Sequence, residues 1–377
     1  MLDDCQSILD LRARARRRLP VPVFNILDGG AESEVTLRRN TLAFDRMKLV
    51  PRCLVDVDKV DTSTRLLGQP IQWPVYCSPT GSSCLFHREG ESAVARAAAR
   101  AGTLYGLSTA STQSIEQVAA ASDGPKIFQL YICRDRDLTR QLMERARRSG
   151  YCALCVTVDT AVVGNCDRES RDGLFTPWPQ WPLRTYLAFA RRPAWSLSRL
   201  GARRLTLANF ADPQGRPPPG DIFRRQLDPS ITWKDIREVA DFWKGPLAIK
   251  GIMSPADASR AADAGATAIV VSNHGGRQLD GAAASIEVVP DIKAAVSAET
   301  EIILDSGVRR GVHVLKALAA GAKACSIGRP YLYGLSAGGE AGVTRALSIL
   351  RSELELAMRL AGCPDLASID GTLLSVD

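Results

Sequence analysis

One of the three histidines in the chain has a sequence context suited to proton transfer. His274 lies in the string Ser272-Asn-His-Gly-Gly-Arg-Gln-Leu-Asp280, directly after an apolar run. Imidazole titrates near neutral pH and commonly serves as a general base. Arg277 follows three residues later, and its planar guanidinium can hold a carboxylate through two hydrogen bonds. The spacing therefore predicts a base and a carboxylate-binding group in one loop.

The remaining candidates for proton chemistry are assigned supporting roles. Asp159 follows another apolar run and is expected to orient the imidazole of His274 and favour its protonated form. His87 precedes Arg88-Glu89-Gly90 and is expected to shape a turn. His313 stands near the start of a helix and is expected on the surface. No metal site is expected.

Two strings near the end of the chain have the composition of a phosphate site. They are Asp305-Ser-Gly-Val-Arg-Arg-Gly311 and Ile327-Gly-Arg-Pro330. Glycine lets backbone N–H groups approach an anion, and arginine adds a bidentate donor. The alternative is a pair of glycine-containing turns with solvated arginines. Because both strings carry the same chemistry, a phosphate site is favoured.

The elements that must position these residues alternate regularly. Ala-rich amphipathic stretches at 89–101, 136–149, 255–264 and 311–320 separate short β-rich runs, which predicts parallel strands with crossover helices. Eight runs indicate an α/β fold of the (β/α)8 TIM barrel type. An open doubly wound sheet is the rival, but its glycine fingerprint is missing. The runs are Val75–Thr80, Thr103–Ser108, Lys126–Tyr131, Ala153–Asp159, Pro246–Lys250, Thr267–Ser272, Glu301–Asp305 and Ala324–Gly328.

The carboxyl ends of the predicted strands carry polar or charged residues almost without exception. Active sites of TIM barrels lie at this end. A strand used only for packing would not end in this way eight times. The residues concerned are Pro79, Thr80, Gly81, Ser108, Thr109, Gln129, Tyr131, Thr157, Asp159, Lys250, Ser272, Asp305, Gly328 and Arg329.

Two segments do not follow the repeat, although 1–377 is expected to be a single domain. Residues 1–70 begin with a basic helix, Ile8–Arg18, and are expected to cap one end of the barrel. Residues 173–230 are expected to form a long inserted loop after the fourth strand, without a core of its own. Its 173–211 part has no acidic residue and contains Trp178, Trp181, Trp195, Arg184, Arg191, Arg192, Arg199, Arg203 and Arg204.

Composition restricts the functional classes. The net charge of +7 over 377 residues suits an anionic ligand and falls short of a nucleic-acid signature. The ten cysteines are scattered, and no signal peptide or transmembrane stretch is apparent, so a cytoplasmic chain with reduced thiols is expected. Cys152 and Cys155 would point to opposite faces of a strand and are expected to be packing residues.

Taken together, these strings resemble the FMN-dependent 2-hydroxy acid dehydrogenase and oxidase family, which includes glycolate oxidase, L-lactate dehydrogenase and (S)-mandelate dehydrogenase. The resemblance runs from Gly29-Gly-Ala-Glu32 and Thr36-Leu-Arg-Arg-Asn40 to the C-terminal helix. Its most specific parts are the His274 string through Gly281, the Asp305–Gly311 string and Phe128-Gln-Leu-Tyr131. It implies FMN as cofactor and homotetrameric assembly.

The resemblance also implies a role for each site residue. His274 takes the substrate proton with help from Asp159, Tyr131 bonds the reacting hydroxyl, and Arg277 binds the carboxylate. Lys250 places a positive charge beside the flavin. The remaining cofactor contacts fall to the residues Pro79, Thr80, Gly81, Ser108, Gln129, Thr157 and Ser272 around the flavin ring, Asp305 at the ribityl chain, and Gly307, Arg309, Gly328 and Arg329 at the phosphate.

The chain departs from the family pattern at two substrate-binding positions. Ile26 stands where the family usually has Tyr, and Cys166 stands where it usually has Arg. Arg168 would substitute for that Arg if the loop shifts. Each lost donor to a buried carboxylate costs about 1–3 kcal/mol. These departures favour a larger, more apolar substrate or one bound less through its carboxylate.

The resemblance predicts oxidation of an L-2-hydroxy acid to the 2-oxo acid, with electrons passing to a quinone or another acceptor. Gly81 favours a dehydrogenase, because oxidases of the family tend to carry Ala there. The arginines and tryptophans of 173–211 suit peripheral contact with the inner face of a membrane, or else a solvated lid. The alternatives are an O2-using oxidase, an oxidase of an amine or peptide-derived substrate, and a non-catalytic flavin-binding protein.

Overall fold

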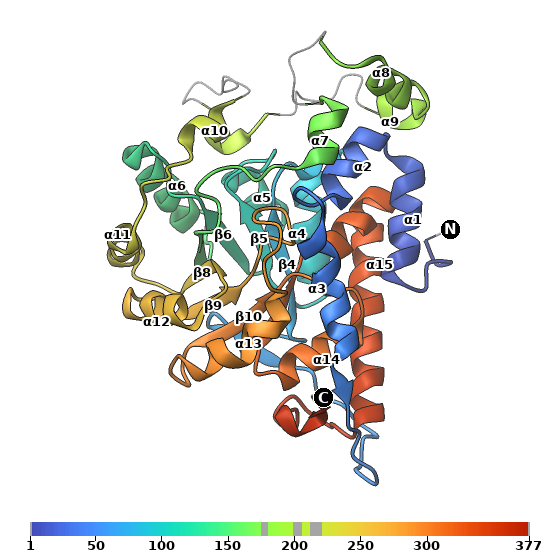
Figure 1. The fold of residues 1–377 in the computed structure, drawn as a ribbon, viewed down its shortest axis with the longest axis vertical. Helices are drawn as coiled ribbons and strands as arrows, with labels where there is room; N and C mark the ends of the chain where they lie inside the picture. The colour runs from blue at the N-terminus through green and yellow to red at the C-terminus, as the bar shows by residue number, and fades with distance from the viewer. Residues whose placement is uncertain (1, 175–179, 199–205, 212–220, 376–377) are drawn as a thin grey trace.

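Eight parallel strands close into a barrel in the computed structural model, which describes residues 2–174, 180–198, 206–211 and 221–375. Strands pair in chain order, and β11 pairs with β4 to complete the ring (Figure 1). The predicted TIM barrel is therefore confirmed, and each predicted strand overlaps an observed one. The strands are β4 (Val75–Thr80), β5 (Tyr105–Ser108), β6 (Lys126–Leu130), β7 (Ala153–Thr157), β8 (Leu247–Ile252), β9 (Ala268–Val271), β10 (Glu301–Asp305) and β11 (Ala324–Ile327).

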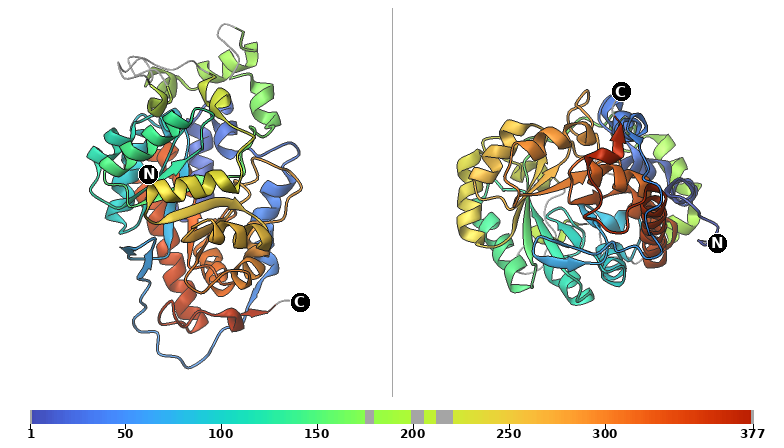
Figure 2. Two further views of the ribbon diagram at one scale, coloured as in Figure 1. Left: turned by 90° about the vertical axis from the view of Figure 1, so that its left-hand side faces the viewer. Right: turned by 90° about the horizontal axis from the view of Figure 1, so that it is seen from below.

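Helices surround the barrel, as the end-on view of Figure 2 shows. Several begin at the side-chain caps that the sequence supplies. Ser114 and Gln117 form a capping box, and Asp135 and Ser254 accept hydrogen bonds from the first turns that follow them. The helices are α4 (Gly90–Arg100), α5 (Ile115–Ala121), α6 (Arg136–Arg148), α11 (Trp233–Trp243), α12 (Pro255–Asp263), α13 (Ser285–Ala294), α14 (Gly311–Ala319) and α15 (Arg329–Ala361).

The amino end of the barrel is closed by a hairpin from the N-terminal segment. Strands β2 (Thr64–Leu66) and β3 (Gln69–Ile71) pair antiparallel. Their apolar residues pack in one cluster with inward-facing residues of the barrel strands, such as Tyr76 and Cys155. The backbone N–H of Leu67 also donates to the carboxylate of Glu301, 2.8 Å away at the start of β10. This end of the barrel is therefore packed shut.

The remaining N-terminal elements lie along the side of the barrel and reach its carboxyl end. Helix α1 (Ile8–Arg18) packs on α15, and α2 (Val21–Asp28) also contacts α15. Helix α3 (Val35–Arg46) packs on α13, while β1 (Lys48–Leu49) pairs with β12 (Leu374–Ser375). The end of α2 carries Ile26, and the loop after it lies beside the residues that follow β9. Residues 1–70 thus contribute to both ends of the barrel.

The predicted inserted loop is partly helical, and its aromatic side chains form a small cluster that packs against the main core. It contains α8 (Leu183–Ala190), α9 (Pro193–Leu197) and α10 (Ile222–Gln226), and follows α7 (Asp167–Asp172). Trp181 stacks on Phe189, and the ring centroid of Phe189 lies 5.4 Å from that of Trp195. Figure 1 shows α8 and α9 beyond α7, away from the barrel. Trp178, Arg199, Arg203 and Arg204 lie outside the described residues.

A buried asparagine is one of the residues that tie the insertion to the barrel. Asn209 is buried, and its Nδ2 donates to Ser111 Oγ at 2.9 Å and to the carbonyl oxygens of Ser108 and Thr109. Its Oδ1 accepts the N–H of Ile115 at 3.0 Å. One side chain therefore holds this part of the insertion against the loop between β5 and α5.

Two further sequence expectations can be compared with the structure. Cys152 and Cys155 are free thiols that pack in the apolar cluster inside the barrel, which confirms them as packing residues. They share that one cluster rather than serving opposite faces. Within the described part of the chain, no helix is long and apolar enough to cross a membrane.

Candidate active site

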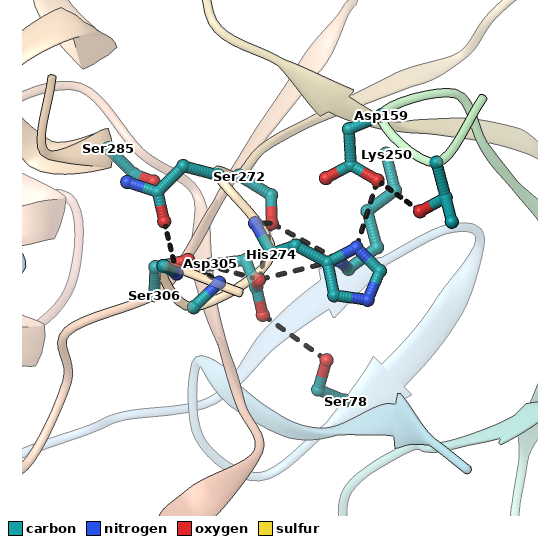
Figure 3. Close-up of polar contacts among 12 residues, drawn as sticks. Ser78, Asp159, Lys250, Ser272, His274, Ser285, Asp305 and Ser306 are labelled. Carbon is teal, nitrogen blue, oxygen red and sulfur yellow. Dashed lines mark hydrogen bonds and ion pairs between the residues drawn. The ribbon is translucent and has the colours of Figure 1, made fainter. Parts of the chain in front are cut away.

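The structure brings the predicted site residues to the carboxyl end of the barrel. Most are carried by a strand end or by the segment that follows it, so chain segments far apart in sequence meet around one mouth. Figure 3 shows part of this group. The residues at or just after the strand ends are Pro79, Thr80 and Gly81 for β4, Ser108 for β5, Gln129 and Tyr131 for β6, Thr157 and Asp159 for β7, Lys250 for β8, Ser272 and His274 for β9, Asp305 and Gly307 for β10, and Gly328 and Arg329 for β11.

The backbone at His274 adopts a left-handed conformation, with φ at 58°. Such a conformation is costly for a residue with a side chain and tends to persist at functional sites. The N–H of His274 donates to Ser272 Oγ at 3.0 Å, and the following Gly276 also has a positive φ. A Cβ on Gly276 would lie 2.6 Å from the backbone nitrogen of Leu37. The tight turn therefore fixes where the imidazole stands.

The imidazole of His274 faces a carboxylate. His274 Nδ1 lies 2.9 Å from Asp159 Oδ1 (Figure 3). Burial alone raises the pKa of Asp159, but the charges of His274 and Lys250 outweigh it and lower the pKa below its ordinary value. Asp159 is thus ionised and orients the imidazole through Nδ1. This arrangement leaves the Nε2 side of the ring for a reactant.

A buried ion pair lies beneath this dyad. Lys250 Nζ donates to Ser272 Oγ at 3.1 Å and lies 3.5 Å from Asp305 Oδ2. Asp305 accepts hydrogen bonds from Ser272 Oγ at 2.6 Å and Ser78 Oγ at 3.2 Å (Figure 3). Burial lowers the pKa of Lys250, but attraction to Asp305 and Asp159 outweighs this and raises it. Lys250 therefore keeps a positive charge inside the barrel mouth.

Three buried side-chain atoms at the mouth have no hydrogen-bond partner among the described residues. They are Gln129 Nε2, Thr157 Oγ1 and Asp159 Oδ2. Gln129 is oriented by Ser108, whose Oγ donates to Gln129 Oε1 at 2.9 Å. An unsatisfied buried polar group costs about 1–3 kcal/mol, so these atoms indicate a ligand. An amide donor, a hydroxyl and the Lys250 ammonium fit the polar edge of the flavin that the resemblance implies.

The predicted phosphate end brings arginines close together. Burial and the charges of Arg309 and Arg277 lower the pKa of Arg329 to about 10. Mutual repulsion of this kind favours a bound anion. Arg329 donates to the carbonyl oxygens of Gly275 at 2.9 Å and Gly29 at 2.7 Å. Its guanidinium is thus tied to two backbone segments beside the expected phosphate.

Gly307 shows why this loop requires glycine. Its φ is 86°, and a Cβ there would lie 2.1 Å from the carbonyl oxygen of Asn40 on α3. The loop before α14 is therefore in close contact with the N-terminal segment, and its N–H groups are held in place.

His313 is not on the surface, contrary to the sequence-based expectation. It is 6% exposed, and its ring stacks on Phe44 with centroids 4.4 Å apart. Nδ1 accepts the N–H of Arg309 at 3.3 Å. Burial lowers the pKa of His313 to about 4, so it is a neutral acceptor near pH 7. The expectation failed because α3 covers this turn. His87 closes a turn as expected, since its carbonyl oxygen accepts the N–H of Gly90.

Tyr131 follows β6 and is covered by the insertion. Its ring meets that of Phe223 on α10 edge to face, with centroids 5.1 Å apart. Burial raises the pKa of Tyr131 to about 12, so the hydroxyl keeps its proton and serves as a donor. Phe223 was not singled out by the sequence analysis, because nothing in its surroundings distinguishes it from other apolar residues of the insertion.

Arg277 is engaged on both terminal nitrogens. Nη1 donates to the carbonyl oxygens of Ile26 at 2.9 Å and Gly29 at 3.0 Å, while Nη2 donates to Glu169 Oε1 at 2.6 Å. Burial lowers the pKa of Arg277, but the carboxylate of Glu169 outweighs it and raises the pKa. Glu169, on α7, was missed by the sequence analysis. An acidic residue among other polar residues in the sequence does not indicate which distant side chain it will pair with.

The two departures from the family pattern lie where they were expected to matter. Ile26 supplies the carbonyl that accepts from Arg277, and its side chain packs against the apolar core. Cys166 is buried, with Sγ 3.9 Å from the carbonyl oxygen of Arg277. Arg168 pairs with Asp28 at 3.3 Å and with Glu34. Its guanidinium is thus held by α2 and the turn after it.

Comparisons with known proteins match this geometry. A model of the FMN-dependent dehydrogenase family matches residues 15–376. An L-lactate oxidase of Nostoc sp. is 44% identical, covering 98% of this chain and 97% of its own length. An L-lactate dehydrogenase of Caulobacter vibrioides is 42% identical, also covering 98% of this chain and 97% of its own.

Solved structures agree over the same length. The crystal structure of the monotopic membrane protein (S)-mandelate dehydrogenase is 35% identical and covers 99% of this chain and 100% of that chain, with a TM-score of 0.95. A mandelate oxidase structure is 37% identical over 99% of both chains, with a TM-score of 0.83. The similarity therefore covers the barrel and the segments added to it.

Proposed function

Because the chain belongs to the FMN-dependent dehydrogenase family, whose members are oxidoreductases acting on CH–OH donors, we propose that it oxidises an L-2-hydroxy acid with an apolar side chain. The observation that carries this proposal is the His274–Asp159 pair, 2.9 Å apart, beside the unpartnered buried atoms of Gln129 and Thr157. A base, a cofactor site and a carboxylate-binding arginine then share one mouth.

His274 removes the proton from the substrate hydroxyl. The adjacent carboxylate of Asp159 stabilises the imidazolium that forms, since the lowered pKa of Asp159 keeps it ionised. Bound FMN supplies the acceptor for the hydride equivalent that leaves the α-carbon. Tyr131 donates its hydroxyl proton in a hydrogen bond to the reacting oxygen, because its raised pKa keeps that proton in place.

Two cationic groups hold the anionic parts of the complex. Arg277 binds the substrate carboxylate, and Lys250 stays protonated through Asp305 and Asp159, so it would supply a positive charge to the polar edge of bound FMN. Ser108, Gln129, Thr157 and Ser272 would bond the ring, Asp305 the ribityl chain, and Arg309 and Arg329 the phosphate. Pro79, Thr80 and Gly81 would line one side of the ring at the end of β4.

The substrate side chain is proposed to be apolar because the two departures from the family pattern near Arg277 are less polar than the residues they replace. Ile26 and Cys166 replace two polar donors, and the ring of Phe223 lies over Tyr131. Relatives are described as acting on lactate and mandelate, whose side chains are a methyl and a phenyl group. An apolar wall favours the larger of these, since burying its ring adds hydrophobic free energy.

We propose that the electron acceptor of this protein is a molecule other than O2. We also propose that the insertion contacts a membrane. Leu183, Leu187 and Leu197 on α8 and α9 are 74%, 46% and 62% exposed, next to the exposed Arg184 and Arg191. Exposed apolar and basic side chains together suit an acidic lipid surface. The mandelate dehydrogenase of similar structure is described as monotopic.

An anaerobic screen tests the proposed reaction directly. The FMN-loaded protein is mixed with lactate, 2-hydroxyoctanoate, (S)-mandelate and (R)-mandelate, and the flavin absorbance is followed. We expect rapid bleaching by S-acids and faster reduction by mandelate than by lactate. Absence of bleaching by every acid would overturn the reaction. A repeat in air with a peroxide assay, and sedimentation with anionic vesicles, test the acceptor and the membrane contact separately.

A further inference from the structure

The carboxylate of Glu169 accepts a hydrogen bond from Arg277, the residue that is proposed to bind the substrate carboxylate. Its Oε1 lies 2.6 Å from Arg277 Nη2, and its side chain is only 13% exposed. The other terminal nitrogen of Arg277 already donates to two backbone carbonyl oxygens, at 2.9 Å and 3.0 Å. An incoming carboxylate therefore meets a guanidinium whose charge is already balanced.

Other contacts besides this one hold α7 in place. Arg168 on the same helix pairs with Asp28 and Glu34, and Asn25 Nδ2 donates to Asp172 Oδ2 at 2.7 Å. These bonds attach α7 to α2 and to the turn after it, independently of Glu169. Glu169 instead points across to Arg277, where the substrate is expected.

We propose that Glu169 is a specificity-determining residue that competes with the substrate carboxylate for Arg277. The inference rests on the proposed function only in taking Arg277 as the carboxylate-binding group. Small hydroxy acids, which have little besides the carboxylate to bind with, must displace Glu169 or share Arg277 with it. Acids with a large apolar side chain offset that cost by packing near Ile26 and Phe223.

The loss of Arg at position 166 sharpens the competition. A second arginine there would supply charge for both carboxylates, but this chain has the buried thiol of Cys166, 3.9 Å from the carbonyl oxygen of Arg277. One guanidinium is left to serve two carboxylates. Like charges at one site disfavour each other's presence, so Glu169 weakens the binding of every anionic substrate.

The test uses FMN-loaded protein and the substitution Glu169→Gln, which keeps the size of the side chain and removes its charge. We expect the Kd of 2-hydroxyisobutyrate, which has no α-hydrogen and cannot be oxidised, to fall by about 10- to 100-fold. Binding is read from the perturbed FMN spectrum. The KM for lactate should fall by a similar factor, while kcat stays within about twofold.

Two controls separate charge competition from a structural effect. Asp167→Asn removes a charge from the same helix, at a side chain that is 40% exposed and pairs with Arg171, and it should change neither constant. Lactamide, which has no negative charge, should gain nothing from Glu169→Gln. Glu169→Asp withdraws the carboxylate by one methylene and should give a smaller gain, so the inference can be tested even if Glu169→Gln loses FMN.

The outcomes are distinguishable. An unchanged or weaker Kd in both Glu169 variants, or an equal gain for lactamide, would overturn the competition. If no hydroxy acid reduces the flavin but Glu169→Gln still tightens 2-hydroxyisobutyrate, the proposed oxidation fails and the assignment of Glu169 stands.

Discussion

The side of the mouth that faces the expected cofactor is built from barrel strands, whereas the side that faces the substrate carboxylate is built from segments outside the barrel. Lys250, Gln129 and Thr157 project from β8, β6 and β7 and are buried. Ile26, Cys166 and Glu169 come from α2, the turn before α7, and α7 itself. A strand in a closed barrel cannot move a side chain without disturbing its neighbours on both sides, and the two departures from the family pattern, Ile26 and Cys166, both lie outside the barrel strands.

Substitutions on the strand side and on the outer side of the mouth are therefore expected to have different effects. Changes on the strand side should alter the rate of the chemical step or the retention of FMN. Changes on the outer side should alter substrate affinity and selectivity while the reaction itself survives. Each substitution below tests one side of that division.

The largest effect is expected from His274→Ala. Removing the base should slow flavin reduction by about 10²–10⁴-fold while FMN stays bound, because the imidazole contacts Asp159 rather than the cofactor-binding atoms. Rapid anaerobic mixing with (S)-mandelate measures the rate, and absorbance of the purified protein measures FMN content. A variant reduced at the wild-type rate would remove His274 from the mechanism.

Lys250→Met should act on cofactor retention and stability together. It leaves the buried carboxylate of Asp305 without its cation, and breaking a buried pair in this way costs about 3–5 kcal/mol. We expect loss of FMN during purification and a lower Tm. Lys234→Met, at an 83% exposed side chain on α11, is the control and should change neither. Full FMN occupancy in Lys250→Met would contradict the placement of this charge.

On the outer side, Ile26→Tyr and Cys166→Arg should improve the use of short acids. Each adds a donor near the substrate carboxylate, worth at most about 1.5–3 kcal/mol. We expect kcat/KM for lactate to rise and the preference for mandelate to fall, with the FMN content unchanged. If kcat/KM for lactate does not rise in either variant or in the double variant, the pocket has been rebuilt beyond these two positions.

A pH titration should give the smallest effect and reports on the start of α14, where His313 stacks on Phe44. The pKa of His313 is about 4 in the folded chain, below its usual value of about 6.5 when unfolded. As the pH falls, His313 therefore becomes protonated in the unfolded chain before it does so in the folded chain. Its contribution to the free energy of unfolding is complete above about pH 6.5 and is lost as the pH drops toward 4. The loss at pH 5 should be about 2 kcal/mol, lowering Tm.

The comparison for this titration is His313→Asn, which keeps an acceptor for the N–H of Arg309. Its Tm should depend less on pH between 7 and 5 than that of the wild type. Equal pH dependence in the two proteins would show that other groups dominate the acid response.

The division between the two sides also explains what could be predicted from sequence. The strand-side residues were found because each follows an apolar run, and parallel strands bring such positions together. The partners of Arg277 and Arg309 could not be found in that way. Glu169 and His313 acquire their roles from contacts with Arg277 and with Phe44, more than a hundred residues away in each case. Local periodicity carries no information about such contacts.

The hairpin β2–β3 has a consequence for the order of events. Since its apolar residues fill the amino end of the barrel, that end offers no route inward. The organic acid and the molecule that later collects the electrons must both arrive at the carboxyl end, which α7 and α10 already narrow. The oxidised product then has to leave before a bulky acceptor can approach. Double-reciprocal plots of initial rate against hydroxy acid concentration, at several acceptor concentrations, should therefore give parallel lines. This pattern is expected for a ping-pong mechanism, in which the first product leaves before the second reactant binds.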